Sequence, residues 1–230
     1  MKLKTLAVGL AAVLLAACGG GGGDPGTQST KLNAEQKVAV TSAAKKLTLN
    51  NSFGAIKVIG ESGRTEILMK PTLKTGTAED GDIKVAESGD TVAVQVNKSA
   101  SGDIAVDIVV YTPEALEFTV NTSGGALDLT GMKGSGTANT GDGSCTVNMD
   151  LGTNGTLTLN TAKGDIGVTV SATTKGTLTV QATNGTFTVD QDLEFSGSVL
   201  GGMGTGNING GGDATITLNT SEGNVSVSEK

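Results

Sequence analysis

The 230-residue chain contains no histidine and no tryptophan, and aromatic residues make up only 2% of it. Histidine is the usual general base near neutral pH, and aromatic rings are the usual stacking surface for sugars. Arg64 is the sole arginine, and the formal net charge is −7. Because nucleic acids and anionic lipids bind clustered Lys and Arg, we expect no nucleic-acid partner. We also predict no catalytic residues, no cofactor and no metal site, and therefore a protein that is not an enzyme.

The N-terminus has the three parts of a secretory signal peptide. Lys2 and Lys4 precede an apolar stretch from Leu6 to Ala16, which ends in Leu15-Ala16-Ala17-Cys18. The stretch is about half the roughly 20 residues that a membrane-spanning helix needs, which disfavours a permanent transmembrane anchor. The tetrapeptide resembles the bacterial lipobox. That resemblance implies cleavage after Ala17 and lipidation of Cys18.

Lipidation with two or more acyl chains would anchor the chain firmly to a membrane. Gly19 follows the cysteine in place of the Asp that often marks inner-membrane retention, which favours the outer membrane in a double-membrane bacterium. Residues 19–30 are rich in glycine and polar residues and are typical of a flexible tether, with a reach of roughly 20 Å. We therefore expect a secreted, lipid-anchored envelope protein.

These features divide the chain into four parts. Residues 1–17 are the signal peptide, 18–30 the lipidated cysteine and tether, 31–45 a lead-in or cap segment, and 46–230 a domain of β-strand repeats. The cap segment is the one place where the sequence is compatible with a helix. A strand that covers the first coil of the domain fits its Val38-Ala39-Val40-Thr41 core equally well. Both alternatives stay open.

Thirty-six glycines and abundant Thr, Val, Asn and Ser favour many short strands joined by tight turns. A phrase Gly-x-hydrophobic-x-hydrophobic recurs, and its spacing is 21 residues from Gly143 to Gly206. In the clearest unit, Leu157 and Leu159 point inward before the turn, and Ile166 and Val168 point inward after it. The repeated glycines are Gly54, Gly81, Gly102, Gly125, Gly143, Gly164, Gly185, Gly206 and Gly223.

This period fits a parallel β-solenoid or β-roll with coils of about 20 residues, and the alternative is an antiparallel β-sandwich. A column of amides four residues before the glycine favours the solenoid, because amide side chains at matching positions of an in-register parallel stack can form a hydrogen-bonded ladder. Turn formation is the competing explanation of the column. Its members are Asn50, Asn121, Asn139, Asn160, Gln181 and Asn219. Nine such coils would make a rod of about 40 Å, with an irregular N-terminal half.

The run Ile108–Pro113 followed by Leu116–Gly125 resembles the bacterial putative-adhesin family of β-strand-repeat proteins, a domain of unknown function. Members of that family resemble this chain in an irregular β half, a strand ending in Pro and Thr-x-x-Gly-Asp-Ile repeats. The resemblance implies a β-solenoid or β-roll on the cell surface. It carries over no functional residues.

Several other residue types in the sequence are ones that carry chemistry in proteins. Residues 201–209 approach a calcium-binding nonapeptide, but Gly206 replaces its Asp ligand. Asp82, Asp103 and Asp165 are explained by turn capping, and the cluster Glu79, Asp80 and Asp82 by a solvated loop. Cys145 aligns with Ile166, Phe187 and Val225 and should be a buried small hydrophobe. We expect Arg64 to pair with Glu61 or Glu66 at the surface.

Two functions remain. The first is a non-catalytic, membrane-anchored surface or structural module that contacts a polysaccharide or another envelope protein. The alternative is a polysaccharide-active β-solenoid enzyme that uses carboxylates, which would need two of them about 5 to 9 Å apart in one groove.

Overall fold

The computed structural model describes residues 35–40, 45–76, 83–96 and 104–230. The predicted signal peptide, the cleavage residues Leu15, Ala16 and Ala17, the lipidation site Cys18 and the tether lie outside the described residues. So do the repeat glycines Gly81 and Gly102, and the acidic residues Glu79, Asp80, Asp82 and Asp103. Within the described ranges, no helix is long and apolar enough to cross a membrane.

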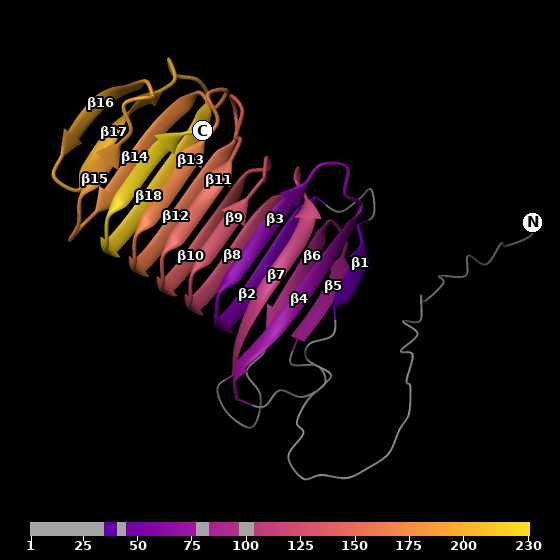
Figure 1. Cartoon of the computed structure of the whole chain (residues 1–230). Coiled ribbons are helices and arrows are strands. Elements are labelled where there is room, and N and C mark those ends of the chain that lie inside the picture. The colour runs from indigo at the N-terminus through magenta and orange to yellow at the C-terminus, as the bar shows by residue number, and fades with distance from the viewer. Residues whose placement is uncertain (1–34, 41–44, 77–82, 97–103) are drawn as a thin grey trace, which may run out of the picture.

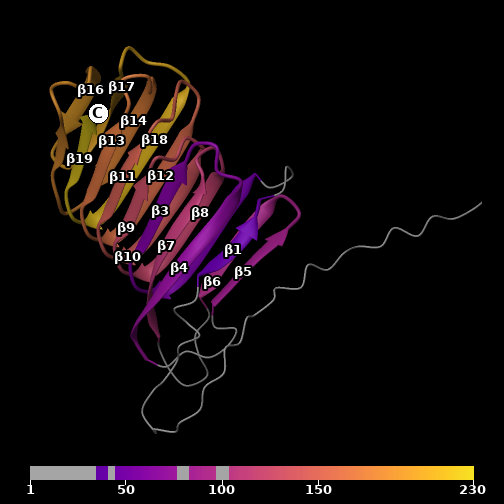
Figure 2. The ribbon, with the colours of Figure 1, turned by 45° about the vertical axis from the view of Figure 1, so that its right-hand side comes forward.

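The described chain folds into two large β-sheets that lie face to face (Figure 1 and Figure 2). Sheet A runs in the order β1 (Gln36–Ala39), β4 (Glu66–Thr75), β7 (Ala105–Pro113), β3 (Ile56–Glu61), β9 (Leu127–Thr130), β11 (Cys145–Met149), β13 (Ile166–Val170), β19 (Val225–Glu229) and β15 (Phe187–Val189). Sheet B runs in the order β16 (Phe195–Leu200), β17 (Met203–Ile208), β14 (Gly176–Ala182), β18 (Ala214–Glu222), β12 (Thr156–Lys163), β10 (Gly136–Asp142), β8 (Glu117–Gly124), β2 (Lys46–Phe53), β6 (Thr91–Val96) and β5 (Ile83–Ser88).

Each coil of the fold contributes one strand to each sheet. In the coil made of β12 and β13, Leu157 and Leu159 are buried beneath sheet B, and Ile166 and Val168 are buried beneath sheet A. Their strands pair in parallel with the strands of neighbouring coils. The alternation places one apolar row of every strand in the core between the sheets. The all-β parallel solenoid predicted from the sequence is therefore confirmed, and the antiparallel sandwich was the wrong alternative.

The stacking order of the coils differs from their order in the chain. β18 pairs with both β12 and β14, so the last coil, β18 and β19, lies between two earlier ones. Likewise β2 pairs with both β6 and β8, so the coil of β2 and β3 lies between the coils of β6 with β7 and β8 with β9. At each end of the stack, a coil has been inserted between two others. These contacts join segments far apart in the sequence.

The prediction of nine coils was wrong, because the described residues form seven parallel ones. The unit around Gly206 is not a coil: β17 runs antiparallel to β14 and forms a hairpin with β16. At the opposite end of the stack, β1, β4 and β5 also pair antiparallel to their neighbours. Antiparallel strands therefore close both ends. With them, the ten strands of sheet B span roughly 43 Å at about 4.8 Å each.

In the segment 31–45, residues 36–39 form a strand and not a helix. This strand, β1, pairs with β4 at the edge of sheet A. Its burial alternates between half-buried and exposed, because one side faces the core and the other faces solvent.

A column of glycines lets the coils approach one another at the turn between the sheets. Gly125 and Gly164 have φ angles of 128° and 142°, which L side chains rarely adopt. A Cβ atom on Gly164 would also overlap the backbone of Gly143 in the coil below, and one on Gly125 would overlap Gly54. Glycine is thus required at this position for two reasons: the positive φ angle of the turn and the short distance to the neighbouring coil.

Candidate binding face

The outer surface of sheet B carries a ladder of asparagines. Asn121 donates to Asn50 over 2.8 Å, Asn139 to Asn121 over 2.7 Å, Asn160 to Asn139 over 2.7 Å, and Asn219 to Asn160 over 2.8 Å. Gln181 lies opposite Asn219 on the next strand of the same row. The structure thus brings together all the amides of the predicted column in one row, with the coil of Asn219 inserted ahead of that of Gln181.

A row composed mostly of threonines runs beside the asparagine ladder, two residues earlier on each strand except the antiparallel β17. Its members point outward, are exposed or half-buried, and lie one strand spacing apart, about 4.8 Å. From β6 to β16 the row consists of Ala93, Thr48, Thr119, Thr137, Thr158, Thr217, Thr179, Thr205 and Ser198. We call this row and the asparagine ladder together the Thr/Asn face.

A second set of polar residues fixes the coils from inside. Thr161 donates to the carbonyl oxygen of Gly143 over 3.1 Å, and Thr220 donates to that of Gly164 over 3.1 Å. In the coil of β2, Asn51 takes this place and donates to the Val106 carbonyl oxygen over 2.8 Å. These side chains are buried, and each ties one coil to the next. The backbone beneath the Thr/Asn face is therefore held in a regular spacing.

The centre of the Thr/Asn face is uncharged. Charged residues lie at the ends of its strands, such as Lys46 and Glu117 at one end and Lys163 and Glu222 at the other. Three shallow depressions lie on this face. The first, of about 370 Å³, is lined in part by Thr48, Thr119 and Thr137 and by the strand-end charges Lys46 and Glu117. The second, of about 520 Å³, is lined in part by Asn50, Asn121 and Asn139, and the third, of about 380 Å³, in part by Asn160, Gln181 and Asn219. The surface can therefore offer hydroxyl and amide groups for hydrogen bonding along many strands. Its uncharged centre does not select a ligand by charge.

Among the described residues, no group of three or more His, Cys, Asp or Glu side chains is placed to hold a metal ion. One hollow of about 370 Å³ on the sheet A side includes two carboxylates, Glu114 and Asp150. Lys133 forms an ion pair of 3.1 Å with Glu114. Asp150 accepts hydrogen bonds from the Gly152 amide and the Thr173 hydroxyl. Both carboxylates therefore have local partners that account for their positions.

Asp165 and Cys145 also have structural surroundings. Asp165 accepts a hydrogen bond of 2.7 Å from the backbone N–H of Asn224 at the turn of the neighbouring coil. Cys145 is buried in β11 and pairs in register with Ile166 and Leu127. Burial, with a smaller contribution from the negative charge of Asp128, raises the pKa of the Cys145 thiol from 9.0 to about 12. A thiol with this pKa is a poor nucleophile at neutral pH.

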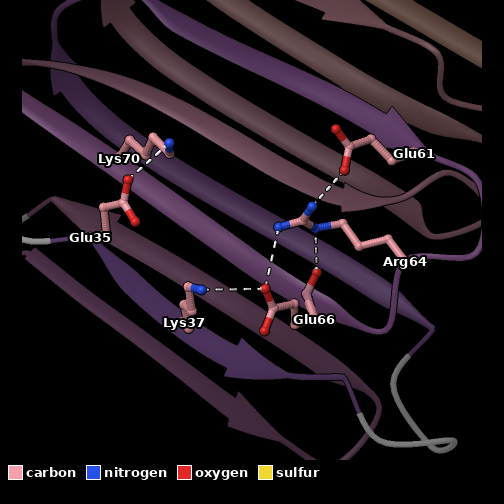
Figure 3. Close-up of polar contacts among 6 residues, drawn as sticks. All are labelled: Glu35, Lys37, Glu61, Arg64, Glu66 and Lys70. Carbon is pink, nitrogen blue, oxygen red and sulfur yellow. Dashed lines mark hydrogen bonds and ion pairs between the residues drawn. The ribbon is translucent and has the colours of Figure 1, made fainter.

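Arg64 lies at the N-terminal end of sheet A, in the cluster shown in Figure 3. Its guanidinium contacts Glu61 at 2.5 Å and Glu66 at 3.6 Å, so the structure provides both of the partners proposed from the sequence. Lys37 of β1 reaches Glu66 of β4, and Lys70 of β4 reaches Glu35 just before β1. The cluster thereby fastens β1 to β4.

The ring of Tyr111 lies near the same cluster. The Arg64 guanidinium and the Lys70 ammonium are each 5.5 Å from the ring centre, within the range of cation–π attraction. The hydrogen bond and charge of Lys70 lower the pKa of Glu35, and those of Glu35 raise the pKa of Lys70. The Lys37–Glu66 and Lys70–Glu35 pairs are exposed, so they position β1 more than they stabilise the core.

The outward threonine row was not identified from the sequence. The sequence does contain its signal, a Thr-x-Asn pair in successive strands, in which Thr and Asn share a face because they are two residues apart. The threonines that directly follow the asparagines point to the other side of the strand and are buried, namely Thr122, Thr140, Thr161 and Thr220.

Comparison with known proteins gives one family and matches to several solved structures. The model of the Toastrack DUF4097 family matches residues 77–228. The crystal structure of a putative cell adhesion protein from Clostridium sporogenes superposes with a TM-score of 0.59 at 13% identity and covers 86% of this chain and 99% of that chain. That of a putative adhesin from Bacteroides fragilis has a TM-score of 0.31 at 11% identity and covers 89% and 100%. No curated protein matches. The Clostridium structure shows the same fold.

Proposed function

We propose that this chain, which belongs to the Toastrack DUF4097 family, is a non-catalytic binding module of a bacterial cell envelope. The match confirms the family resemblance deduced from the sequence. The observation that carries the proposal is the Thr/Asn face, a wide and regular hydrogen-bonding surface with an uncharged centre. A face of this kind suits a ligand that is itself long, neutral and repetitive.

The ligand class that fits best is a neutral polysaccharide. Each Thr hydroxyl can donate and accept a hydrogen bond, which matches the hydroxyl groups of a sugar. The face lacks aromatic rings for stacking, so each sugar would bind weakly and affinity would come from many contacts along the polymer. A charged polymer would gain little, because the centre of the face offers no ion-pair partner.

The proposal includes a lipid anchor on Cys18, following cleavage after Ala17, and a location in the cell envelope, at the outer membrane of a double-membrane bacterium. The lipobox pattern Leu15–Cys18 and the Gly-rich residues 19–30 support it. The fold shared with a protein described as a putative cell adhesion protein supports a binding role at the surface. Such an anchor would present the β-domain to a polymer while holding it near the membrane.

Binding to insoluble polysaccharide tests the proposal. The full chain in detergent is sedimented with cellulose and with chitin, and the supernatant is assayed for shortened, newly released sugar. We expect retention without released sugar. Thr119→Lys with Thr179→Lys should reduce retention at least about tenfold, since bulky charges would interrupt the row in two places.

The matched control is Thr146→Lys, at an exposed, outward position of β11 in sheet A, which should leave retention unchanged. Released sugar would overturn the non-catalytic assignment. Retention that is equal in all variants, or absent from both polymers, would remove the Thr/Asn face as the binding site for neutral polysaccharide.

A further inference from the structure

The strand β16 is an open edge of sheet B at the end of the stack opposite β1 and β5 (Figure 1 and Figure 2). It pairs with β17 on one side and with no other strand of the described chain on the other. Five of its six residues are exposed. Its sequence, Phe-Ser-Gly-Ser-Val-Leu, contains no charge and no proline. An edge with these properties is a template for pairing with another strand.

The other three sheet edges carry features that hinder such pairing. Lys37 on β1 and its neighbour Glu35 form ion pairs with β4 (Figure 3). β5 contains Glu87. β15 is only three residues long and is followed by Asp190. Charges and short length are the usual protection of an edge strand. β16 is six residues long and contains no charge, and the nearest charged residue is Glu194, just before it.

Apolar side chains are also gathered at the end of this hairpin. Leu200, Met203 and Val199 are 81%, 59% and 49% exposed, and they are three of the four exposed large hydrophobic residues in the described chain. Leu200 and Met203 lie opposite each other across the hairpin. The open edge and the exposed apolar group therefore coincide.

We propose that β16 pairs antiparallel with β16 of a second copy of this chain, related by a two-fold axis perpendicular to sheet B. A second copy suits this edge because the strand is neutral. Two copies of an acidic chain can meet there without placing like charges on adjacent strands. A two-fold axis also makes the contact closed, so that it ends at a dimer.

The backbone determines which residues meet. The Asn209 amide donates to the Glu194 carbonyl oxygen, and in an antiparallel pair such bonded positions recur at every second residue. The backbone groups of Ser196 and Ser198 therefore face β17, and those of Gly197 and Val199 face the open edge. With the axis at Ser198, Gly197 of each copy exchanges hydrogen bonds with Val199 of the other.

The side chains fit the same register. On the inner face, the Phe195 ring lies over Gly197, so Val199 of the second copy would meet an apolar surface there. On the outer face, Ser198 lies opposite its own copy, and Ser196 lies opposite Leu200. Since Ser198 ends the threonine row, the threonine rows of the two copies become one continuous row, while Met203 and Leu200 occupy the ladder positions of each copy next to the seam. The dimer thus doubles the length of the surface offered to a polymer.

Cysteine cross-linking tests the pairing and its register. The full chain in detergent is used with Cys18→Ala, so that the remaining native cysteine is the buried Cys145. With Ser198→Cys added, the two new thiols lie in directly opposed positions, within the Cα separation that a disulfide spans. Mild oxidation should convert most of the chain to a covalent dimer. Ser196→Cys, on the same face of the same strand, and Thr119→Cys, at the centre of the face, should stay largely uncrosslinked.

Sedimentation of the Cys18→Ala chain gives an independent measurement. We expect a dimer that dissociates on dilution, and Val199→Lys should raise its dissociation constant at least about tenfold, because a charge replaces the apolar contact with the Phe195 ring over Gly197. A chain that stays monomeric at all concentrations would overturn the proposal. So would Ser198→Cys that fails to cross-link while its circular dichroism matches that of the parent, or that cross-links no better than Ser196→Cys.

Discussion

Asn219 donates a hydrogen bond to Asn160 over 2.8 Å, although 59 residues separate them in the chain. The coil that follows Asn160 in the sequence, with Gln181 at the matching position, lies one layer further out. The last coil has therefore entered the stack between two earlier ones. The pairing of β18 with both β12 and β14 therefore joins three segments of the C-terminal half in one stack.

The asparagine ladder should contribute measurably to stability. Asn139→Ala removes one hydrogen bond to Asn121 and one from Asn160, and each is worth about 0.5–1.5 kcal/mol. We expect a loss of about 1–2 kcal/mol in the free energy of unfolding, measured by urea denaturation. Gln181→Ala, at the exposed end of the row, should cost less than about 0.5 kcal/mol. Equal losses would mean that the ladder adds nothing beyond its individual side chains.

The glycine column should tolerate no side chain. Gly164→Ala forces a Cβ into the backbone of Gly143 at a φ angle of 142°, so it should cost more than about 3 kcal/mol or prevent folding. Gly152→Ala is the control. Its φ is 58°, and nothing lies within 4 Å of the added Cβ, so only the backbone cost of about 1 kcal/mol applies. Thermal unfolding of both variants separates steric overlap from conformational cost, and similar melting temperatures would contradict the stacking explanation.

The buried Cys145 thiol should make the free energy of unfolding decrease at alkaline pH. Its pKa is about 12 in the folded chain, whereas an unfolded cysteine loses its proton near pH 8.5–9. The unfolded state therefore releases this proton first, and stability should fall as the pH rises from about 9 toward 12. Cys145→Val, which has no thiol proton, should lack this part of the slope. Urea midpoints between pH 7 and 10.5 measure the difference.

Replacing the same residue by serine tests the nature of its surroundings. Cys145→Ser puts a hydroxyl group into the apolar core, which should cost about 1–3 kcal/mol. Cys145→Val should cost less, because it keeps an apolar side chain in a β-strand. If serine were the better replacement in denaturant titrations, the site would have to be more polar than the structure shows.

The attachment of β1 should weaken in acid. The hydrogen bond and charge of Lys70 lower the pKa of Glu35, so this pair contributes stability above the ordinary pKa of glutamate, and the contribution is lost as the pH falls through the lower, folded-state value. An NMR titration of the Glu35 carboxyl carbon should show the lowered midpoint. Lys70→Met should return it toward its ordinary range, while Lys133→Met, at a distant ion pair, should leave it unchanged.

The sequence by itself determined the class of fold and the content of each layer. Alternation placed Leu157, Leu159, Ile166 and Val168 in the core, and the repeated amides put Asn121, Asn139 and Asn160 in one row. Both follow from local geometry: side chains alternate along a strand, and identical side chains align when strands stack in register.

Only the tertiary structure decided which coil lies beside which. Most coils offer their neighbours a similar strand, with Thr and an amide outward and an apolar residue inward, so the pattern of one coil cannot specify its place in the stack. The antiparallel strands at both ends could not be predicted from the sequence pattern for the same reason. Residues 201–209 keep the glycines and the alternation of a coil, yet pair backward as a hairpin. Order and edges arise from long-range pairing, which the side-chain period alone does not encode.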